Sequence, residues 1–529
     1  MALDLSPFAH AGLDRTAFES LMGEHDLHMR PSLERLWSYY RNPQTPASAT
    51  ATWATLQARS WGGAASGGGQ GRAYRLAQEV GLPARLIDLP TNRRETVIEN
   101  DIAWRIDALA DFAFGRPPRL SSTADDPMLR ALIDAAVSAA WESAGGHALL
   151  LDLATLGLVY GYSDLVLRTD RLFHSSRSLR PIEGDDPSTV AQAARLLSIE
   201  IVEPTRSIPF LDPGDYRSIN AYIIRSRLAP PPAAHTAERS ALGRVFARVR
   251  PGTNSSALAE PGETVEILTA RHRRVWIGGK RVLDEPNPLG MLPVVHIQNN
   301  SQPFRYEGLS DVEPLIPLQD ELNTRLSDRA HRVTMQSFNM YLAKGLDQPT
   351  PTGTAPAHAV APGQVWFTDN TDADIKSFGG DGHSPSEDRH IEELRDALDK
   401  ASGVSPVVIG VIRERLGHLS SENALRITMT GILNRAARRR MAYGRGIADM
   451  SRLVLAALDS AGVLRTRPED REVRVEWPDP LPTDERTRLA NAKAKHELGV
   501  PRDAVLAELG YQTPPNADTH TLATSHGAD

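Results

Sequence analysis

The sequence predicts an α+β fold, and three observations support this prediction. Apolar residues recur at helical spacing in several stretches, for example in residues 127–143 and 147–160. Residues 197–300 instead hold short strand-like runs separated by Gly and Pro, as antiparallel strands are. A long helical stretch at 311–345 is then followed at once by a segment rich in Pro, Gly and Thr. Helical and strand signals therefore occupy separate parts of the chain, which is typical of α+β proteins.

Length and composition exclude several classes of protein. A chain of 529 residues is too long for one hydrophobic core, so two or more domains or subdomains are expected. The absence of Cys excludes disulfides, thiolate metal sites and a cysteine nucleophile. The first residues lack a signal-peptide pattern, and the longest apolar run, 147–162, is too short to span a bilayer, so no membrane partner is expected. The net charge of −7 argues against bulk binding of nucleic acid, so any DNA contact should be local or weak.

The first part of the chain is predicted to be largely helical. Residues 15–42 have helical character and end at Asn42, because Pro43 disfavours helical backbone before it. A further helix is expected to begin at Asn92, since Asn92 can cap it and Glu95 stands three residues later. Apolar residues then continue at helical spacing as far as Ala113.

The helix expected at 311–345 has an unusual mixture of polarity. Its apolar positions form a stripe only one or two residues wide: Leu315, Leu318, Leu322, Leu326 and Val333. The rest of its surface is charged or hydrogen-bonding and includes Asp320 and Asn323. A core helix of a large monomer needs a broader apolar face. The pattern favours a helix that packs against copies of itself and shows its other side to water.

The remaining elements suggest a pair of antiparallel helices that carries a small module and is inserted into a larger body. They are, in order, a strand in QVWFTDN (364–370), a helix at 386–402, an aperiodic segment at 407–419, a long helix from Ser420 or Ser421 to about 460, a strand at 472–477, two short helices, and a polar tail from 512.

Several local motifs occur in this order. They are SYYRNPQ near the start, VIENDIAWRIDALADFAFGRP, NPLGMLPVVHIQNN leading into YEGLSDVEPLIPLQDELNTRLSD, and DKASGVSP followed by LSSENALRITMTGILNRAARRR. Together they resemble the portal proteins, or head-to-tail connectors, of tailed bacteriophages. The likeness runs over most of residues 30–480. Its most specific part is Pro-Leu-Gly-x-Leu-Pro-Val-Val, then Gly-Leu-Ser-Asp, then Leu-x-x-Leu-Gln-Asp-x-Leu-Asn.

The resemblance implies a portal-type fold, with a mixed α/β wing, a stem of two antiparallel helices, a small clip module, a long channel-to-wing helix and a short helical crown. The implied parts are an N-terminal region and wing (1–310), a first stem helix (311–345), a clip (346–383), a second stem helix (384–403), a channel or tunnel loop (404–420), the long helix with a returning wing strand (421–480), and a crown with a mobile tail (481–529).

The resemblance also implies a function. Such a protein is a structural ring at one capsid vertex, usually of twelve subunits, and double-stranded DNA enters and leaves through its channel. Its partners would be terminase, the head-tail adaptor, and the major capsid and scaffolding proteins. It would not be an enzyme and would need no cofactor, because the chain has no Walker-type loop and terminase would supply the energy. It would be located in the virion after assembly in the cytoplasm of the host bacterium.

A different class stays open on the sequence alone, namely a cellular multi-domain enzyme or binding protein without a recognisable motif. The mass in solution separates the two classes. A monomer would have a mass of 57.8 kDa, whereas the ring would be roughly twelve times heavier.

Two groups of candidate site residues follow from the implied parts. In the channel loop, Arg413, Arg415 and His418 are expected to meet DNA phosphates, and the alternative is an ordinary surface connector. In the clip, Trp366 and Phe367 are adjacent aromatic residues on the expected strand, and aromatic side chains are common interface anchors.

A basic cluster begins the long helix, and its spacing places members on more than one helix face. Its members are Arg435, Arg438, Arg439 and Arg440. Ion pairs within or between subunits, DNA contact and a solvated basic face all remain open for it. No catalytic or metal site is expected, because the dense carboxylates lie in loop-like segments and His25 and His28 lack a third ligand nearby.

Overall fold

A computed structural model describes residues 3–46, 74–83, 86, 96–176, 186–227, 263–336, 341–344, 365–368, 372, 385–409, 426–481 and 485–509. The chain divides into two compact units, Met1–Pro478 and Asp479–Asp529.

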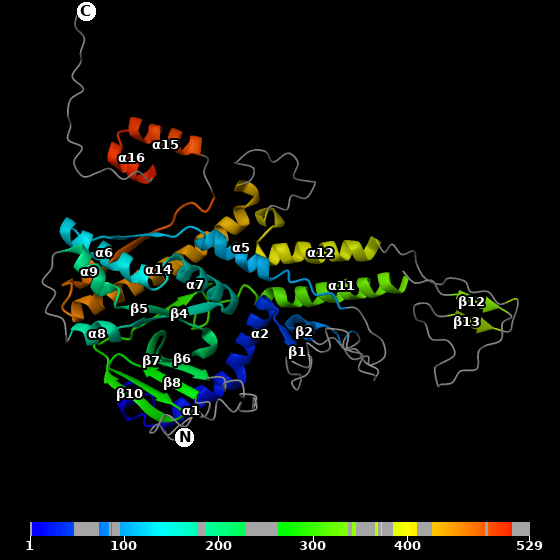
Figure 1. Ribbon diagram of the computed structural model, residues 1–529, viewed down its shortest axis with the longest axis horizontal. Coiled ribbons are helices and arrows are strands. Elements are labelled where there is room, and N and C mark those ends of the chain that lie inside the picture. Colours follow the sequence, from blue (N-terminus) through cyan, green and yellow to red (C-terminus); the bar gives the residue numbers. More distant parts are fainter. Residues whose placement is uncertain are drawn as a thin grey trace, which may run out of the picture. The chain divides into compact units, whose positions relative to one another are not determined.

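The larger unit mixes helices and strands, which confirms the predicted α+β class (Figure 1). Its helices are α1 (Arg15–Glu24), α2 (Arg30–Arg41), α5 (Ala103–Phe114), α6 (Pro127–Ser143), α7 (His147–Tyr160), α8 (Asp170–Ser176), α9 (Pro187–Ala194), α11 (Ile316–Gln336), α12 (Pro385–Ser402) and α14 (Thr430–Ser460). Its strands are β1 (Gln44–Pro46), β2 (Tyr74–Leu76), β3 (Arg119–Ser122), β4 (Tyr162–Arg168), β5 (Ser198–Val202), β6 (Ser207–Asp212), β7 (Asp215–Arg227), β8 (Glu263–Leu268), β9 (His272–Ile277), β10 (Lys280–Pro286), β11 (Val294–Gln298), β12 (Tyr341–Lys344), β13 (Val365–Thr368) and β14 (Val473–Glu476).

Two antiparallel sheets form the centre of this unit, as the short strand runs predict. Their strand orders are β11-β4-β5 and β10-β9-β8-β7-β6. The middle strand β4 is buried on both faces, because successive side chains of a strand point to opposite sides. Leu165 and Leu167 join the core on the helical side, whereas Val166 packs with Tyr222 and Ile224 of the second sheet.

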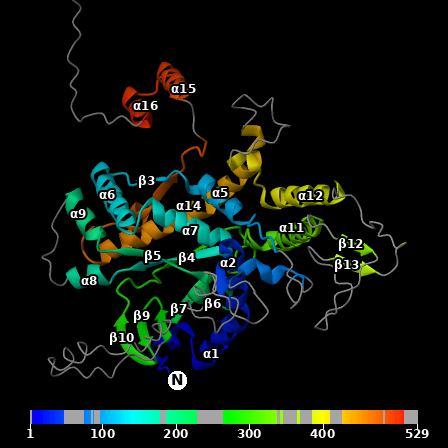
Figure 2. The ribbon, with the colours of Figure 1, turned by 45° about the vertical axis from the view of Figure 1, so that its right-hand side comes forward.

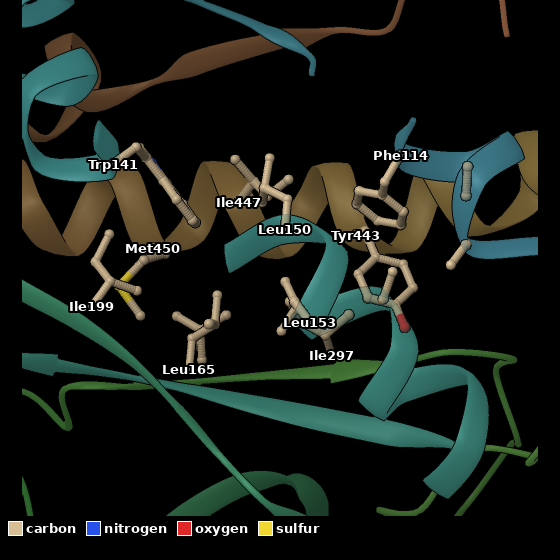
Figure 3. Packing of buried hydrophobic residues seen from close by; sticks show 14 of the residues in the cluster. Phe114, Trp141, Leu150, Leu153, Leu165, Ile199, Ile297, Tyr443, Ile447 and Met450 are labelled. Atoms are coloured by element: carbon tan, nitrogen blue, oxygen red, sulfur yellow. The ribbon is translucent and has the colours of Figure 1, made fainter. Parts of the chain in front are cut away.

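Helices cover the other face of the three-stranded sheet. The long helix α14 contacts β11 and β4 and also packs against α5 and α6, and this layering is visible from two directions in Figures 1 and 2. Figure 3 shows the resulting core, in which Ile447 and Met450 of α14 lie over side chains of α6, α7 and the sheet. Among the described residues, no single helix is long and apolar enough to cross a membrane, and α6 and α7 meet that criterion only jointly, across a 66° bend.

The smaller unit contains the two short helices that the sequence predicts. They are α15 (Glu485–Glu497) and α16 (Arg502–Leu509), and Pro501 immediately precedes the second. A Pro at a helix start costs little, because the first N–H groups of a helix have no partner within it.

Two predicted helix bounds are wrong. The helix expected to begin at Asn92 begins at Ala103, and residues 96–100 have no helical structure. The helix expected to reach residue 345 ends at Gln336, because Tyr341–Lys344 forms strand β12 and pairs in parallel with β13. The strand expected in QVWFTDN is confirmed as β13.

Candidate functional site

The two antiparallel helices that the sequence predicts are α11 and α12, here called the helix pair. The two helices lie side by side in Figures 1 and 2 and contact each other. Ion pairs join the end of α11 to the start of α12, with 3.2 Å between Arg329 Nη1 and Asp388 Oδ1, and a second pair between Arg332 and Glu387. The later residue of α11 pairs with the earlier residue of α12, which confirms the predicted antiparallel arrangement.

The apolar stripe of α11 changes along its length. Leu315 and Leu322 are completely buried within the chain, Leu318 and Leu326 are half-buried, and Val333 is 52% exposed. A side chain without exposed surface cannot pack against a neighbouring subunit. The predicted inter-subunit role is therefore wrong for Leu315 and Leu322, which the single chain already buries.

One polar face of α11 binds an extended segment from far away in the sequence. The backbone N–H groups of this segment donate to side chains of the helix, namely Val97 to Ser327 Oγ (2.9 Å), Glu99 to Asn323 Oδ1 (3.1 Å) and Asp101 to Gln319 Oε1 (3.1 Å). Two residues of extended chain advance about 6.6 Å, and four residues of helix advance about 6 Å. The two spacings nearly match, so one hydrogen bond forms at each step. We call this arrangement the polar ladder.

The ladder side chains are buried and bonded to one another. Gln319, Asn323 and Ser327 have no exposed surface. Gln319 Nε2 donates to Asn323 Oδ1 at 3.0 Å, and Asn323 Nδ2 donates to Gln78 Oε1 at 3.1 Å. Asn323, expected on a hydrated face, is therefore part of the interior. The ladder also explains the wrong start of α5, because the N–H groups of Val97, Glu99 and Asp101 already have partners on α11.

The SYYRNPQ motif contacts the same part of α11. Tyr39 Oη donates to Asp320 Oδ1 at 2.7 Å, and Gln78 Nε2 donates to the Tyr39 carbonyl at 2.7 Å. Burial raises the pKa of the Asp320 carboxyl, and the Tyr39 hydrogen bond opposes this only in part. A Cβ on Gly81 would lie 1.9 Å from Asp320 Oδ1, so this position has no room for a side chain. Motifs separated by about 280 residues thus form one network.

The Gly-Leu-Ser-Asp motif attaches the start of the helix pair to the core. Asp311 forms a buried ion pair with Arg439 of α14, which is 1% exposed. Asn299 Nδ2 donates to the second oxygen of Asp311 at 2.7 Å, and Tyr443 Oη donates to Asn299 Oδ1 at 3.3 Å. The carboxylate therefore has a partner on each oxygen, which a buried charge requires.

Ser310 and Gly308 of this motif also contact the end of α7. Ser310 Oγ accepts from the Val312 N–H at 3.0 Å and donates to the Val159 carbonyl, so it bonds the segment before the helical start to α7. Gly161 has a φ of +93°, and a Cβ there would lie 2.3 Å from the Gly308 carbonyl oxygen. The chain approaches itself here at a distance that only glycine permits.

The base of α12 is held by charged side chains. Arg105 is 1% exposed and donates to Asp399 Oδ1 at 2.6 Å, and Arg395 donates to Glu99 Oε2 at 2.7 Å. Arg435 of α14 donates to the carbonyl of Ala401 at 2.9 Å. A cation at the C-terminal end of a helix is favourable, because the helix dipole is negative there.

The predicted basic cluster is not a basic surface. Arg439 pairs with Asp311, and Arg440 donates to the carbonyls of Ala113 (2.8 Å) and Pro478 (2.7 Å). Arg435 contacts the end of α12, and burial lowers the pKa of its guanidinium. Within the cluster only Arg438 is exposed. The other three arginines join elements of one chain, which favours the interpretation as ion pairs within a subunit over a solvated basic face.

The structure gives no side-chain contacts for the other predicted site residues. Arg413, Arg415 and His418 lie outside the described residues, and Trp366 and Phe367 are placed only as backbone positions of β13. The described flanks of the first group are well anchored. Gly403, with a φ of +66°, ends α12 directly beneath Arg435, where a Cβ would lie 2.4 Å from Arg435 Nε. Residues 404–425 thus leave and rejoin elements that are attached to each other.

Sequence reasoning missed the polar ladder. A signal was present, since Gln319, Asn323 and Ser327 recur every four residues and so share one helix face. Polar residues at that spacing predict a hydrated face, but they serve equally well as a line of bonding groups for a second chain segment. Among the described residues, no group of three or more His, Asp or Glu side chains is arranged to hold a metal ion.

Comparison of the sequence with known protein families finds a match to one family. The sequence profile described as "Phage portal protein, SPP1 Gp6-like" matches residues 91–519. A search of curated proteins finds no match.

Solved structures include similar chains from gene transfer agent (GTA) particles. One is described as "Neck of empty GTA particle computed with C6 symmetry"; it is 14% identical, the match covers 78% of this chain and 90% of that chain, and the TM-score is 0.35. Another, "Virion of native gene transfer agent (GTA) particle", is also 14% identical, covers 78% and 94%, and has a TM-score of 0.28. These scores are too low to support an argument from the arrangement of those chains.

Proposed function

This chain belongs to the SPP1 Gp6-like family of phage portal proteins, and we propose that copies of it form a ring around a channel for double-stranded DNA. The family match over residues 91–519 is the observation that carries the proposal. It confirms the resemblance found in the sequence and supports a structural portal protein over the other class left open there. The role of the chain is structural, at the portal vertex of a phage-like particle, and the cellular enzyme is set aside.

The helix pair is the proposed stem of the ring. Its base is built into the chain through the polar ladder and the Asp311–Arg439 ion pair. Its other end carries Val333, which is 52% exposed, and the Arg329–Asp388 ion pair, whose side chains are about half exposed. A stem needs this combination, because each subunit must hold its own helices while their outer parts remain open to neighbours.

The charge of the helix pair suits passage of DNA. On α12 six carboxylates stand beside three Lys and Arg side chains, and the whole chain carries a net charge of −7. A wall of this kind does not hold phosphates tightly, so DNA can slide past it. Weak local contacts are assigned to Arg413, Arg415 and His418 of the proposed channel loop, which leaves from the Gly403 end of α12.

The partners follow from the same proposal. Residues 346–383 with Trp366 and Phe367 are the proposed clip that meets terminase during packaging and the head-tail adaptor afterwards. The capsid and scaffolding proteins would surround the body of the ring, and terminase would hydrolyse ATP. The portal itself would act without a cofactor and without catalysis.

The test is the mass of the purified full-length chain in solution. A particle roughly twelve times heavier than 57.8 kDa is expected, and a monomer at all concentrations would overturn the ring. Arg413→Ala with Arg415→Ala should leave the ring mass unchanged and lower the amount of DNA retained in assembled particles. Full-length DNA held as stably as in the unaltered protein would remove the channel-loop assignment while leaving the ring in place.

A further inference from the structure

Phe304 is a large aromatic side chain that is mostly exposed, with its ring 6.2 Å from the ring of Tyr216 in β7. It is 84% exposed, and among the described non-glycine residues only it and Asn42 have a positive φ, which is +64° at Phe304. A bulky residue rarely adopts this left-handed backbone, because its Cβ meets the backbone. Unusual backbone of this kind persists only where the surrounding structure enforces it.

The loop around Phe304 is firmly anchored. Tyr306, two residues later, is 4% exposed and donates to the buried Asp164 at 2.9 Å. Gln298 Nε2 donates to the carbonyls of Arg305 (2.8 Å) and Tyr306 (2.9 Å). The fold therefore holds Phe304 outward in a defined position, and a group fixed in this way loses little entropy when it binds.

An apolar groove that can accept an aromatic side chain lies elsewhere on the same unit. It has a volume of about 510 Å³ and is formed by α2, α7 and β5. Half-buried apolar side chains line it, namely Trp37, Leu149, Leu156 and Ile201. An apolar cavity of about 150 Å³ already accepts benzene, so this groove can take a phenyl ring. The exposed Asp152 belongs to its lining.

We propose that the Phe304 loop of one copy of the chain inserts into the α2–α7–β5 groove of the next copy. This rests on the ring of the proposed function and identifies one contact within it. The loop follows β11 and the groove includes β5, and these strands are the opposite edges of the sheet β11-β4-β5. A ring needs two different, complementary surfaces on each subunit, because its contacts run head to tail.

Charge supports the same pairing. Arg305 follows Phe304 directly and is exposed, and the groove offers the carboxylate of Asp152. An aromatic residue beside an arginine is the composition typical of strongly contributing interface positions. Asp152 and Glu200 both line the groove, and Glu200 is already paired with Arg168. The exposed Asp152 therefore favours a basic neighbour, which sets the register of the contact.

Charge reversal tests the pairing. Arg305→Asp and Asp152→Arg should each lower the fraction of chains in rings by several-fold at fixed protein concentration, because each places like charges together. The double variant should restore the fraction toward that of the unaltered protein. Arg445→Asp, at a side chain that is 88% exposed on α14, serves as the matched control and should leave the fraction unchanged.

Cross-linking tests the geometry independently. The chain has no cysteine, so Phe304→Cys with Leu156→Cys should form disulfides only between copies and give a series of covalent multimers after mild oxidation. Phe304→Cys with Met441→Cys, at a residue 72% exposed, should give none. Intact rings with neither the multimers nor the charge effects would overturn this contact alone. A monomeric unaltered protein would overturn the proposed ring, and this contact with it.

Discussion

The two ends of α11 differ in how they are held. At the base, residues 319–327 place three buried polar side chains against the 97–101 segment, and Leu322 is fully buried beside them. At the far end, residues 328–336, Val333 is about half exposed and Arg329 reaches α12 through a solvent-exposed ion pair. One helix thus begins as an interior element and continues as a surface one.

This difference assigns separate tasks to the two ends. Buried hydrogen bonds have a defined geometry and are expensive to leave unmade, so the base fixes the direction of the helix pair within each subunit. Exposed ion pairs contribute little to stability and rearrange easily. The far end is therefore the part that can adapt to the neighbouring copies of the proposed ring.

The largest expected effect is at the junction below the base. Asp311→Ala leaves the buried Arg439 without its counter-ion, which should lower the free energy of unfolding by about 3–5 kcal/mol. Asp388→Ala removes the matching carboxylate at the far end, where both side chains are about half exposed, and should cost about 0–1 kcal/mol. Urea unfolding of both variants measures the contrast, and equal losses would contradict the division between the ends.

A smaller effect is expected in the ladder itself. Asn323→Leu keeps the volume but leaves the Glu99 N–H and Gln78 Oε1 without their partner, at about 1–3 kcal/mol for each buried group. Hydrogen exchange should become faster at the amides of residues 97–101. Arg329→Leu at the far end is the control and should leave these amides protected. Unchanged exchange in the Asn323 variant would mean that the ladder does not hold the segment.

The sequence predicted elements better than it predicted their partners. The helix pair, the long α14 and the two antiparallel sheets follow from local periodicity, and the motifs around Gly308 and Leu315 identified the family. Local periodicity did not predict the polar ladder, because the partners of Gln319 and Asn323 lie more than 200 residues earlier in the chain. Local capping signals at Asn92 likewise predicted a helix at a place where those tertiary hydrogen bonds require an extended chain.

The basic cluster illustrates the same limit for the site. Four arginines close together in sequence suggest a charged surface, yet Arg439 has a buried aspartate and Arg440 has backbone carbonyls as partners. Whether a cation faces water depends on which acceptors the fold brings to it. Spacing along one helix contains no information about acceptors on other elements. The assignments of Arg413, Arg415, His418, Trp366 and Phe367 remain predictions.

The contribution of Asp320, at the base of α11, to stability should depend on pH. Burial raises the pKa of Asp320, so its contribution to stability is present below its unfolded value of 3.8 and is lost as pH rises through the folded pKa. Asp320→Asn keeps an acceptor for the Tyr39 hydroxyl and removes the charge. The variant should therefore be slightly more stable than the unaltered protein at pH 7, with a difference that shrinks toward pH 4. Urea midpoints across this range test it, and a difference that grows in acid would contradict the assignment.

The smallest expected effect is a difference between the two ends of α11 in how their amide exchange responds to salt. The Arg329–Asp388 pair at the far end has side chains 48% and 54% exposed, so its contribution of about 0–1 kcal/mol should be screened. The Debye length falls from about 10 Å at 0.1 M to about 3 Å at 1 M salt. Amides in residues 328–336 should then exchange faster at 1 M NaCl. The amides of Gln319, Asn323 and Ser327 should not, because these neutral side chains are buried and bonded within the chain. Equal acceleration along the whole helix would show that the base depends on surface charge as much as the far end does, and that the polar ladder is not what fixes the stem.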